Sequence, residues 1–101
     1  MNYDLRFSGA SLTLSLIGSL TFVDGDLFKE ALAEIEAASQ TFCIVEMSRL
    51  SFVDSFGLGL LVVLYDLAEK RRMRLVLRHA SGIVRERLNY TEFDSIMSLE
   101  D

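Results

Sequence analysis

The sequence contains no proline and no tryptophan, and it has one cysteine and one histidine. Without proline or low-complexity segments, nothing in the chain resembles a linker. Its 101 residues, 50% of them hydrophobic, suit one core, so we expect a single domain at residues 1–101. The lone Cys43 cannot form an intramolecular disulfide, which favours a reducing compartment. We recognise no signal peptide at the N-terminus and expect a cytoplasmic protein.

Charge and hydropathy argue against two large classes of partner. The formal net charge is −5, whereas nucleic-acid binding depends on clustered Lys and Arg that neutralise phosphates. The one basic cluster, at 70–74, falls at the expected end of a helix, where cations interact favourably with the helix dipole. The longest apolar stretch, at 56–65, is about half as long as a bilayer-spanning helix must be. We therefore expect neither direct nucleic-acid binding nor membrane insertion.

Residue types for catalysis and metal binding are scarce. A serine hydrolase needs a base, and the single His79 lies at the end of an expected strand, where it is interpreted as a satisfied edge residue. Val53 also occupies the first glycine position of a G-x-S-x-G elbow. One Cys and one His give no metal-ligand spacing, and a phosphate-binding P-loop is absent from the sequence. We expect no enzyme activity, no metal and no other cofactor.

Hydrophobic periodicity predicts alternating strands and helices. Alternation of apolar and polar residues predicts a hairpin, and helical spacing predicts amphipathic helices. The expected strands are 3–7, 12–17, 42–47 and 74–78, with a weaker one at 96–99; the expected helices are 26–38, 55–72 and 81–89, and 18–25 is expected to be a loop. The strand at 42–47 is apolar on both faces except at Glu46, which indicates a central position. This order predicts an α/β fold with a mixed sheet of four to five strands, parallel among the later ones, flanked by about three to four helices.

Ser55 lies between the expected central strand and the helix that follows it. Asp54 precedes it, and Gly57 and Gly59 come shortly after. A helix N-terminus presents unpaired backbone N–H groups that favour negative charge, so a phosphate on Ser55 would be accommodated there. The residues alone leave two simpler interpretations open. Ser55 could be an ordinary N-cap hydroxyl, or Asp54 could be the cap with Ser55 in the first helical position.

The segment at 43–68, CIVEMSRLSFVDSFGLGLLVVLYDLA, resembles the core signature of the STAS domain, which is named after sulphate transporters and anti-sigma factor antagonists. The antagonists typically read a hydrophobic strand, D-L-S, and then F-x-D-S-S-G-L-G. The GSL at 18–20 stands where the family often has G-E-L-D, and the GIVRERL at 82–88 resembles its third helix. The resemblance covers nearly the whole chain and implies a STAS fold.

This resemblance implies a phosphorylation-controlled partner switch of the bacterial kind, with Ser55 at the modified position. In such proteins the unmodified antagonist binds an anti-sigma factor that is also a serine kinase with a histidine-kinase-like ATPase fold, and so frees the sigma factor. Phosphorylation breaks the complex, and a PP2C-type phosphatase reverses it. This chain departs from the family pattern at three positions. Phe56 replaces the usual second serine, Thr21 stands where the acidic residue of G-E-L-D would be, and Glu46 replaces the common aspartate of D-L-S. The partner therefore need not hold a sigma factor.

We expect the partner-binding surface to comprise the loop at 51–55, the first turns of the following helix and the loop at 21–26. The expected partner-binding residues are Asp24, Asp54, Ser55, Phe56, Gly57, Leu58 and Gly59. Gly57 and Gly59 either let a partner approach closely or permit tight helix-to-sheet packing. The residues expected in the core instead are Val53, Leu60, Val63, Leu64 and Leu67. In the helix at 81–89, the inward-facing residues are expected to be Ile83, Val84 and Leu88.

A constitutive STAS subunit of an ABC transporter or a sensory assembly is the main alternative. It would bind its partner without a phosphate cycle, through a permanent interface of Leu58, Leu61, Val62 and Tyr65. A nucleotide- or lipid-binding STAS module is a third possibility, for which the chain offers no discriminating residue. The sequence leaves open the oligomeric state, the identity of the kinase and phosphatase, and the downstream output.

Overall fold

A computed structural model describes residues 1–91, 93 and 97–101 of the chain. The described elements form a five-stranded sheet with three α-helices and one short 3-10 helix. In chain order they are β1 (Asn2–Ser8), β2 (Ser11–Leu20), η1 (Phe22–Asp24), α1 (Gly25–Glu36), β3 (Phe42–Val53), α2 (Ser55–Lys70), β4 (Arg74–Arg78), α3 (Gly82–Tyr90) and β5 (Ser98–Glu100). The predicted α/β fold with a mixed sheet is confirmed. The weak strand expected at 96–99 falls partly on Ile96, which lies outside the described residues.

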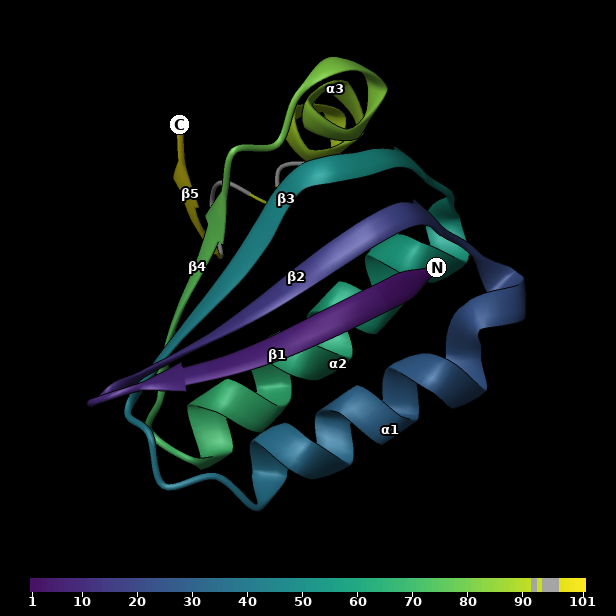
Figure 1. Cartoon of the computed structure of the whole chain (residues 1–101). Coiled ribbons are helices and arrows are strands. Elements are labelled where there is room, and N and C mark those ends of the chain that lie inside the picture. Colours follow the sequence, from purple (N-terminus) through teal and green to yellow (C-terminus); the bar gives the residue numbers. More distant parts are fainter. Residues whose placement is uncertain (92, 94–96) are drawn as a thin grey trace.

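The order of strands in the sheet follows their order in the chain, β1-β2-β3-β4-β5. β1 and β2 form an antiparallel hairpin whose turn places Gly9 at a φ of 58°, a left-handed conformation that glycine adopts without strain. The three remaining pairs are parallel, so the later strands form the parallel part, as predicted. α1 and α2 lie side by side against one face of the sheet, and α3 lies across β3 away from them (Figure 1).

The core lies between the sheet and the two helices α1 and α2. Its fully buried side chains alternate along β2 and recur at helical spacing on both helices; they include Leu12, Leu14, Leu16, Phe28, Ile35, Leu61 and Leu64. Each such side chain contributes roughly 1.5–3 kcal/mol when it is removed from water. Cys43 lies in the same core and is a free thiol. Burial raises the pKa of this thiol to about 12, which fits a packing role.

Both β2 and β3 extend beyond their expected ends. β2 continues to Leu20 through part of the expected loop, and β3 continues to Val53 instead of ending at Met47. The pairing of β3 with β2 shifts register twice, so that β3 carries an extra residue at each shift. Such bulges interrupt the two-residue alternation of side chains and bend the strand. This is why the sequence pattern hid the second half of β3, whose curved end leads directly into α2 (Figure 1).

Two side chains expected in the core lie at the surface. Val63 on α2 is 49% exposed, and Ile83 on α3 is 39% exposed. Val84 and Leu88 are buried as predicted and hold α3 on the sheet. None of the described helices combines the length and the hydrophobicity that a membrane span requires.

Candidate functional site at the start of α2

Asp54 caps α2 and ties the helix to η1. Its Oδ1 accepts a hydrogen bond from the backbone N–H of Gly57, with an N···O distance of 2.7 Å. Its Oδ2 accepts another from the backbone N–H of Phe22, at 3.1 Å. The first bond satisfies one of the donors that a helix N-terminus leaves unpaired. Of the two capping arrangements left open by the sequence, Asp54 as the cap with Ser55 first in the helix is the one found.

Ser55 is the first residue of α2, and its side chain is exposed. Because Asp54 provides the cap, the Ser55 hydroxyl is not needed to hold the helix. Within the part of the chain that the structure describes, no side-chain hydrogen bond involves its Oγ. The hydroxyl is therefore accessible to a second protein and to covalent modification.

Asp24 does not face outward, so the expectation that it lies at the surface is wrong. It is 6% exposed. Its carboxylate accepts hydrogen bonds from the Thr21 backbone N–H at 2.7 Å and from the amino group of Met1 at 2.9 Å. Burial opposes ionisation of Asp24, but the hydrogen bonds from the Met1 ammonium and from Thr21 outweigh it and hold the pKa of this carboxyl below its usual value. Asp24 therefore stabilises the turn of η1 and its contact with the N-terminus, instead of facing a partner.

The two glycines of α2 have opposite surroundings. Gly57 is buried, and a Cβ there would overlap the carbonyl oxygen of Leu20 and lie 2.8 Å from Cγ2 of Val53. Gly57 therefore allows α2 to pack tightly on β2 and β3, and the expectation that it lies open to a partner is wrong. Gly59 is exposed, and a Cβ there would have no neighbour within 4 Å. It leaves the helix surface open.

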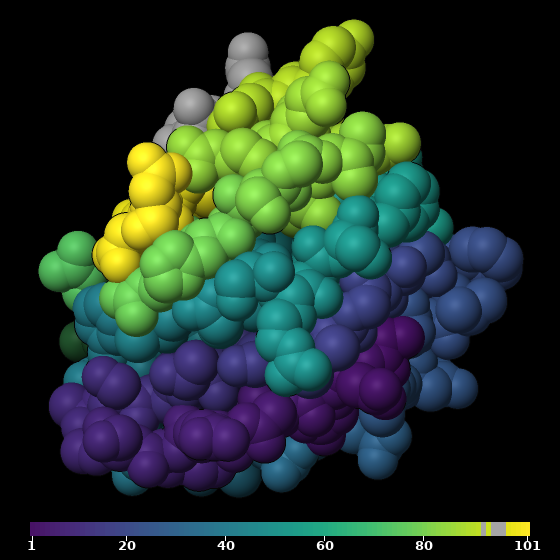
Figure 2. Space-filling view, turned by 45° about the horizontal axis from the view of Figure 1, so that its top comes forward, coloured from purple at the N-terminus to yellow at the C-terminus, as the bar shows by residue number. Residues whose placement is uncertain are grey.

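An exposed apolar surface lies beside Ser55, formed by Phe56 and by two side chains of the segment at 21–26 that was expected to contribute to the binding surface. Phe22 and Val23 on η1 are each 72% exposed, and Phe56 on α2 is 50% exposed. The Phe56 ring packs beside Gly25, the residue after η1, 3.6 Å from the position of a Cβ there, and the Phe22 backbone bonds to Asp54 at the start of α2, so the three side chains are carried by two elements that contact each other. We call them the η1 patch; the segment that carries η1 projects at the right edge of the molecule in Figure 2 (blue). Adjoining exposed apolar side chains of this kind mark interaction surfaces.

Leu58 does not belong to that exposed surface. It is only 8% exposed, and it lines a pocket between α2 and α3. The pocket has a volume of about 320 Å³ and is lined by Ser55, Leu58, Ile83, Glu86, Arg87, Tyr90 and Thr91. The contribution of α3 to the surroundings of Ser55 was missed, because the helix was expected to turn its apolar residues inward. Figure 2 shows α3 in yellow-green above the teal of β3.

The permanent interface expected for a constitutive subunit does not form one surface. Leu61 is fully buried and Leu58 nearly so, whereas Val62 and Tyr65 are partly exposed. These residues therefore cannot all contact a partner.

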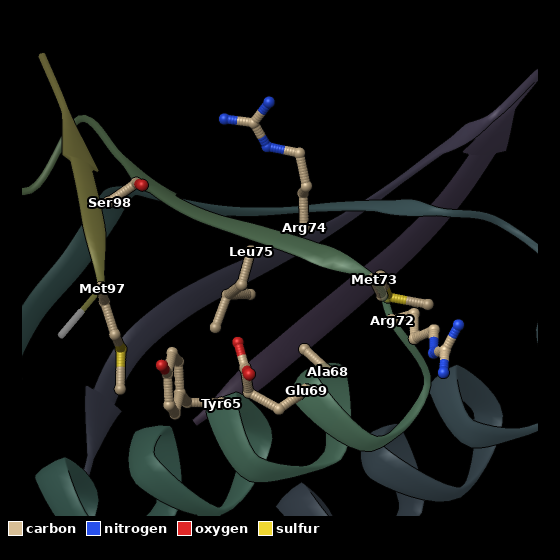
Figure 3. A pocket seen from close by; sticks show the side chains of 9 residues that line it. All are labelled: Tyr65, Ala68, Glu69, Arg72, Met73, Arg74, Leu75, Met97 and Ser98. Carbon is tan, nitrogen blue, oxygen red and sulfur yellow. The ribbon is translucent and has the colours of Figure 1, made fainter.

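A second pocket, of about 400 Å³, lies near the far end of α2 against β4 and β5 (Figure 3). Tyr65, Leu75 and Met97 point toward it, while Arg74 points away. At 1.5 Å per residue, the end of α2 is about 20 Å from Ser55. This pocket is therefore separate from the surface around Ser55.

His79 is a satisfied residue at the end of β4, as predicted. Its Nδ1 lies 2.9 Å from Oε2 of Glu46 on the neighbouring β3. Glu46 also accepts a hydrogen bond from the backbone N–H of Ser48 at 3.1 Å. Burial disfavours the Glu46 carboxylate, but the hydrogen bonds from His79 and Ser48 outweigh this and lower its pKa. The pair contributes to the structure of the sheet, away from the start of α2.

The fold is similar to those of solved anti-sigma factor antagonists. A Thermotoga maritima protein proposed to be such an antagonist gives a TM-score of 0.88 at 20% sequence identity, covering 98% of this chain and 86% of that one. The antagonist SpoIIAA of Bacillus in its unphosphorylated form gives 0.74 at 20% identity, covering 99% and 88%. SpoIIAA has also been solved in a phosphorylated form, with a TM-score of 0.73.

A sulfate transporter family protein from Wolinella succinogenes gives a TM-score of 0.80 at 23% identity, covering 95% of this chain and 80% of that one. At these identities the likeness is one of fold alone. No curated protein matches the sequence. Residues 2–101 match the STAS domain as a protein family, and the chain therefore belongs to the STAS domain family.

Proposed function

We propose that this protein is a partner-switching regulator whose binding surface is the η1 patch together with the start of α2. In its unmodified form it binds an anti-sigma factor that is also a serine kinase with a histidine-kinase-like ATPase fold, and so relieves inhibition of a sigma factor. Phosphorylation of Ser55 breaks the complex. The observation that carries the proposal is an accessible Ser55 hydroxyl, free of the capping role, next to three exposed apolar side chains.

The chemistry of the modification suits a switch. The kinase transfers the γ-phosphoryl group of ATP to Oγ of Ser55, which loses its proton, and ADP leaves. The product carries about −1.5 to −2 charge at neutral pH. When a partner covers the η1 patch, water is excluded, and an unpaired charge at its border costs roughly 2–5 kcal/mol. That corresponds to a loss of affinity of about 30-fold to several thousandfold.

The free phosphorylated protein does not suffer this cost. Ser55 stays exposed to water when no partner is bound, and the N-terminus of α2 favours an anion by about 0.3–1 kcal/mol. The modification is therefore tolerated by the isolated protein and opposed in the complex. A PP2C-type phosphatase would restore the binding form.

Direct comparison of charge variants tests the proposal. The kinase partner is first identified by co-purification with the Ser55→Ala protein from its native cells, and affinities are then measured by calorimetry. Ser55→Ala should bind as the unmodified protein does, and Ser55→Asp should bind at least about 30-fold more weakly. Ser8→Asp is the matched control, because Ser8 is exposed on the β1–β2 hairpin and outside the proposed surface; it should bind normally.

Equal binding by Ser55→Asp and Ser55→Ala would contradict the switch. It would favour a constitutive subunit, the role suggested by the likeness to a sulfate transporter family protein. The mass of the intact protein from its native cells, before and after phosphatase treatment, gives an independent check. We expect one removable phosphate, and peptide mapping should place it on Ser55.

A further inference from the structure

The pocket between α2 and α3 brings one cation to the same hollow as Ser55. Arg87 reaches this pocket from α3, and Ser55 lines it from the first turn of α2. The guanidinium carbon of Arg87 lies 5.1 Å from the centre of the Phe52 ring. Phe52 comes three positions before Ser55 in the sequence, at the end of β3. Two separate observations therefore place the Arg87 side chain next to the strand-to-helix junction.

Arg87 differs from its neighbour Arg85 on the same helix in having no described carboxylate partner. Arg85 forms an ion pair with Asp101 at 2.7 Å. The Nε of Arg87 is buried and has no hydrogen-bond partner in the part of the chain that the structure describes. Buried hydrogen-bond donors nearly always have an acceptor in folded proteins, so a buried donor without one needs an explanation. An anion that is present in only one state of the protein would supply it.

We propose that Arg87 is the intramolecular receptor for the phosphate on Ser55. This inference rests on the proposed function and extends it, because it says where the phosphate goes after the partner has left. The Arg87 guanidinium binds the phosphate oxygens across the pocket and joins the start of α2 to α3. Arginine suits this task because its planar group can give two parallel N–H···O bonds to a phosphate.

The size and the charges of the pocket are compatible with this role. Its volume of about 320 Å³ is roughly ten times the ~30 Å³ that one water molecule occupies, so a phosphate group fits. Two carboxylates oppose the phosphate, Asp54 from the β3–α2 junction and Glu86 from α3. The Asp54 oxygens already accept hydrogen bonds from two backbone N–H groups. Arg87 is the one cation among the pocket-lining residues that the structure describes.

The test measures the second ionisation of the phosphate itself. Phosphoserine is incorporated at position 55 during translation, so that no kinase is needed, and its phosphorus resonance is followed by NMR between pH 4 and pH 8. The ordinary second pKa of such a phosphate is about 6. With Arg87 present, the titration midpoint should lie at least about 0.5 pH units lower than in Arg87→Gln, because a nearby cation favours the dianion. The difference should shrink in 1 M salt.

Arg85→Gln is the matched control, since it removes the same charge from the same helix but from a side chain outside the pocket. Its midpoint should equal that of the unaltered phosphoprotein. Circular dichroism of both variants checks that α3 remains folded, and Arg87→Lys should recover part of the shift because it keeps the charge without the planar fork.

Equal midpoints for Arg87→Gln and the unaltered phosphoprotein would overturn the inference. So would a loss of partner affinity in unphosphorylated Arg87→Gln without any change in the titration, which would assign Arg87 to a carboxylate of the partner instead. Neither outcome would contradict the proposed partner switch, which is tested separately by the partner affinities of the Ser55 variants. Conversely, the shift in midpoint can be observed even if no partner responds to phosphorylation.

Discussion

Phe22 donates its backbone N–H to Oδ2 of Asp54, 3.1 Å away, although the two residues are 32 positions apart in the sequence. The same carboxylate caps α2 through its other oxygen. One side chain next to Ser55 therefore positions both the helix start and the apolar residues of η1. A substitution at Asp54 should therefore change both the stability of the fold and the shape of the proposed binding surface.

Asp54→Ala should lower the free energy of unfolding by about 1–2 kcal/mol, the usual cost of losing an N-cap. Urea denaturation followed by circular dichroism measures this. Ser55→Ala is the control and should change stability by less than about 0.5 kcal/mol, because the Ser55 side chain is exposed and does not form the cap. A larger loss for Ser55→Ala than for Asp54→Ala would show that the capping role has been assigned to the wrong residue.

Alanine at the two glycines of α2 should act in opposite directions. Gly57→Ala places a methyl group against the Leu20 carbonyl oxygen and the Val53 side chain, so it should destabilise the protein by about 1–3 kcal/mol. Gly59→Ala enters open space on an exposed helical surface and should stabilise the protein by up to about 1 kcal/mol. Urea midpoints measure both changes. If the two variants shifted in the same direction, the close approach of α2 to β2 would be in doubt.

Phe22→Ser should weaken binding of the kinase partner by about tenfold or more, since a few buried anchors, often aromatic, carry most of the binding energy of an interface, and Val23→Ser should weaken it less. Their stability should change little, because both side chains are 72% exposed. Phe7→Ser on β1 removes another exposed aromatic, 51% exposed, away from the proposed surface. It should leave the affinity unchanged. Normal binding by both η1 variants would show that the partner binds another face of the protein.

Glu46→Gln should cost stability in a way that depends on pH. The pKa of Glu46 is lower in the folded protein than its ordinary value of 4.5, so its ionised form stabilises the fold above that value. The contribution is lost as the pH falls through the lowered pKa. We expect Glu46→Gln to be about 0.5–1.5 kcal/mol less stable at pH 7, the range of a net hydrogen bond. This difference in the free energy of unfolding should become smaller toward pH 3. A difference that does not depend on pH would argue against hydrogen bonds from Ser48 and His79 to the ionised carboxylate.

The order and type of the elements followed from the sequence because apolar residues repeat regularly along most of them. The periodicity fails in β3 after Met47, where two bulges shift the side chains from one face to the other. A sequence pattern cannot reveal such bulges, since the pairing partner decides where the extra residue is accommodated. The same reason explains why β2 continues past Gly18, whose φ of 91° lies beside the second bulge.

The position of Asp54 and Ser55 at the start of a helix could be predicted from the sequence, whereas the surroundings of these two residues could be predicted only in part. Ser55 and Asp54 were identified by a local pattern at a strand-to-helix junction. The burial of Asp24 and Gly57 depends on contacts with Met1 and Leu20, which are distant in sequence. The loop at 21–26 was expected to belong to the binding surface, but the 3-10 turn that exposes Phe22 and Val23 within it was not predicted, because its capping by Asp24 and its bond to Asp54 depend on tertiary contacts.

The agreement between strand order and chain order has a consequence for biosynthesis. As the polypeptide leaves the ribosome from its N-terminus, each strand after β1 finds the preceding strand, with which it pairs, already synthesised. The sheet can grow from β1 toward β5 by adding one strand at a time, with β5 closing the assembly last.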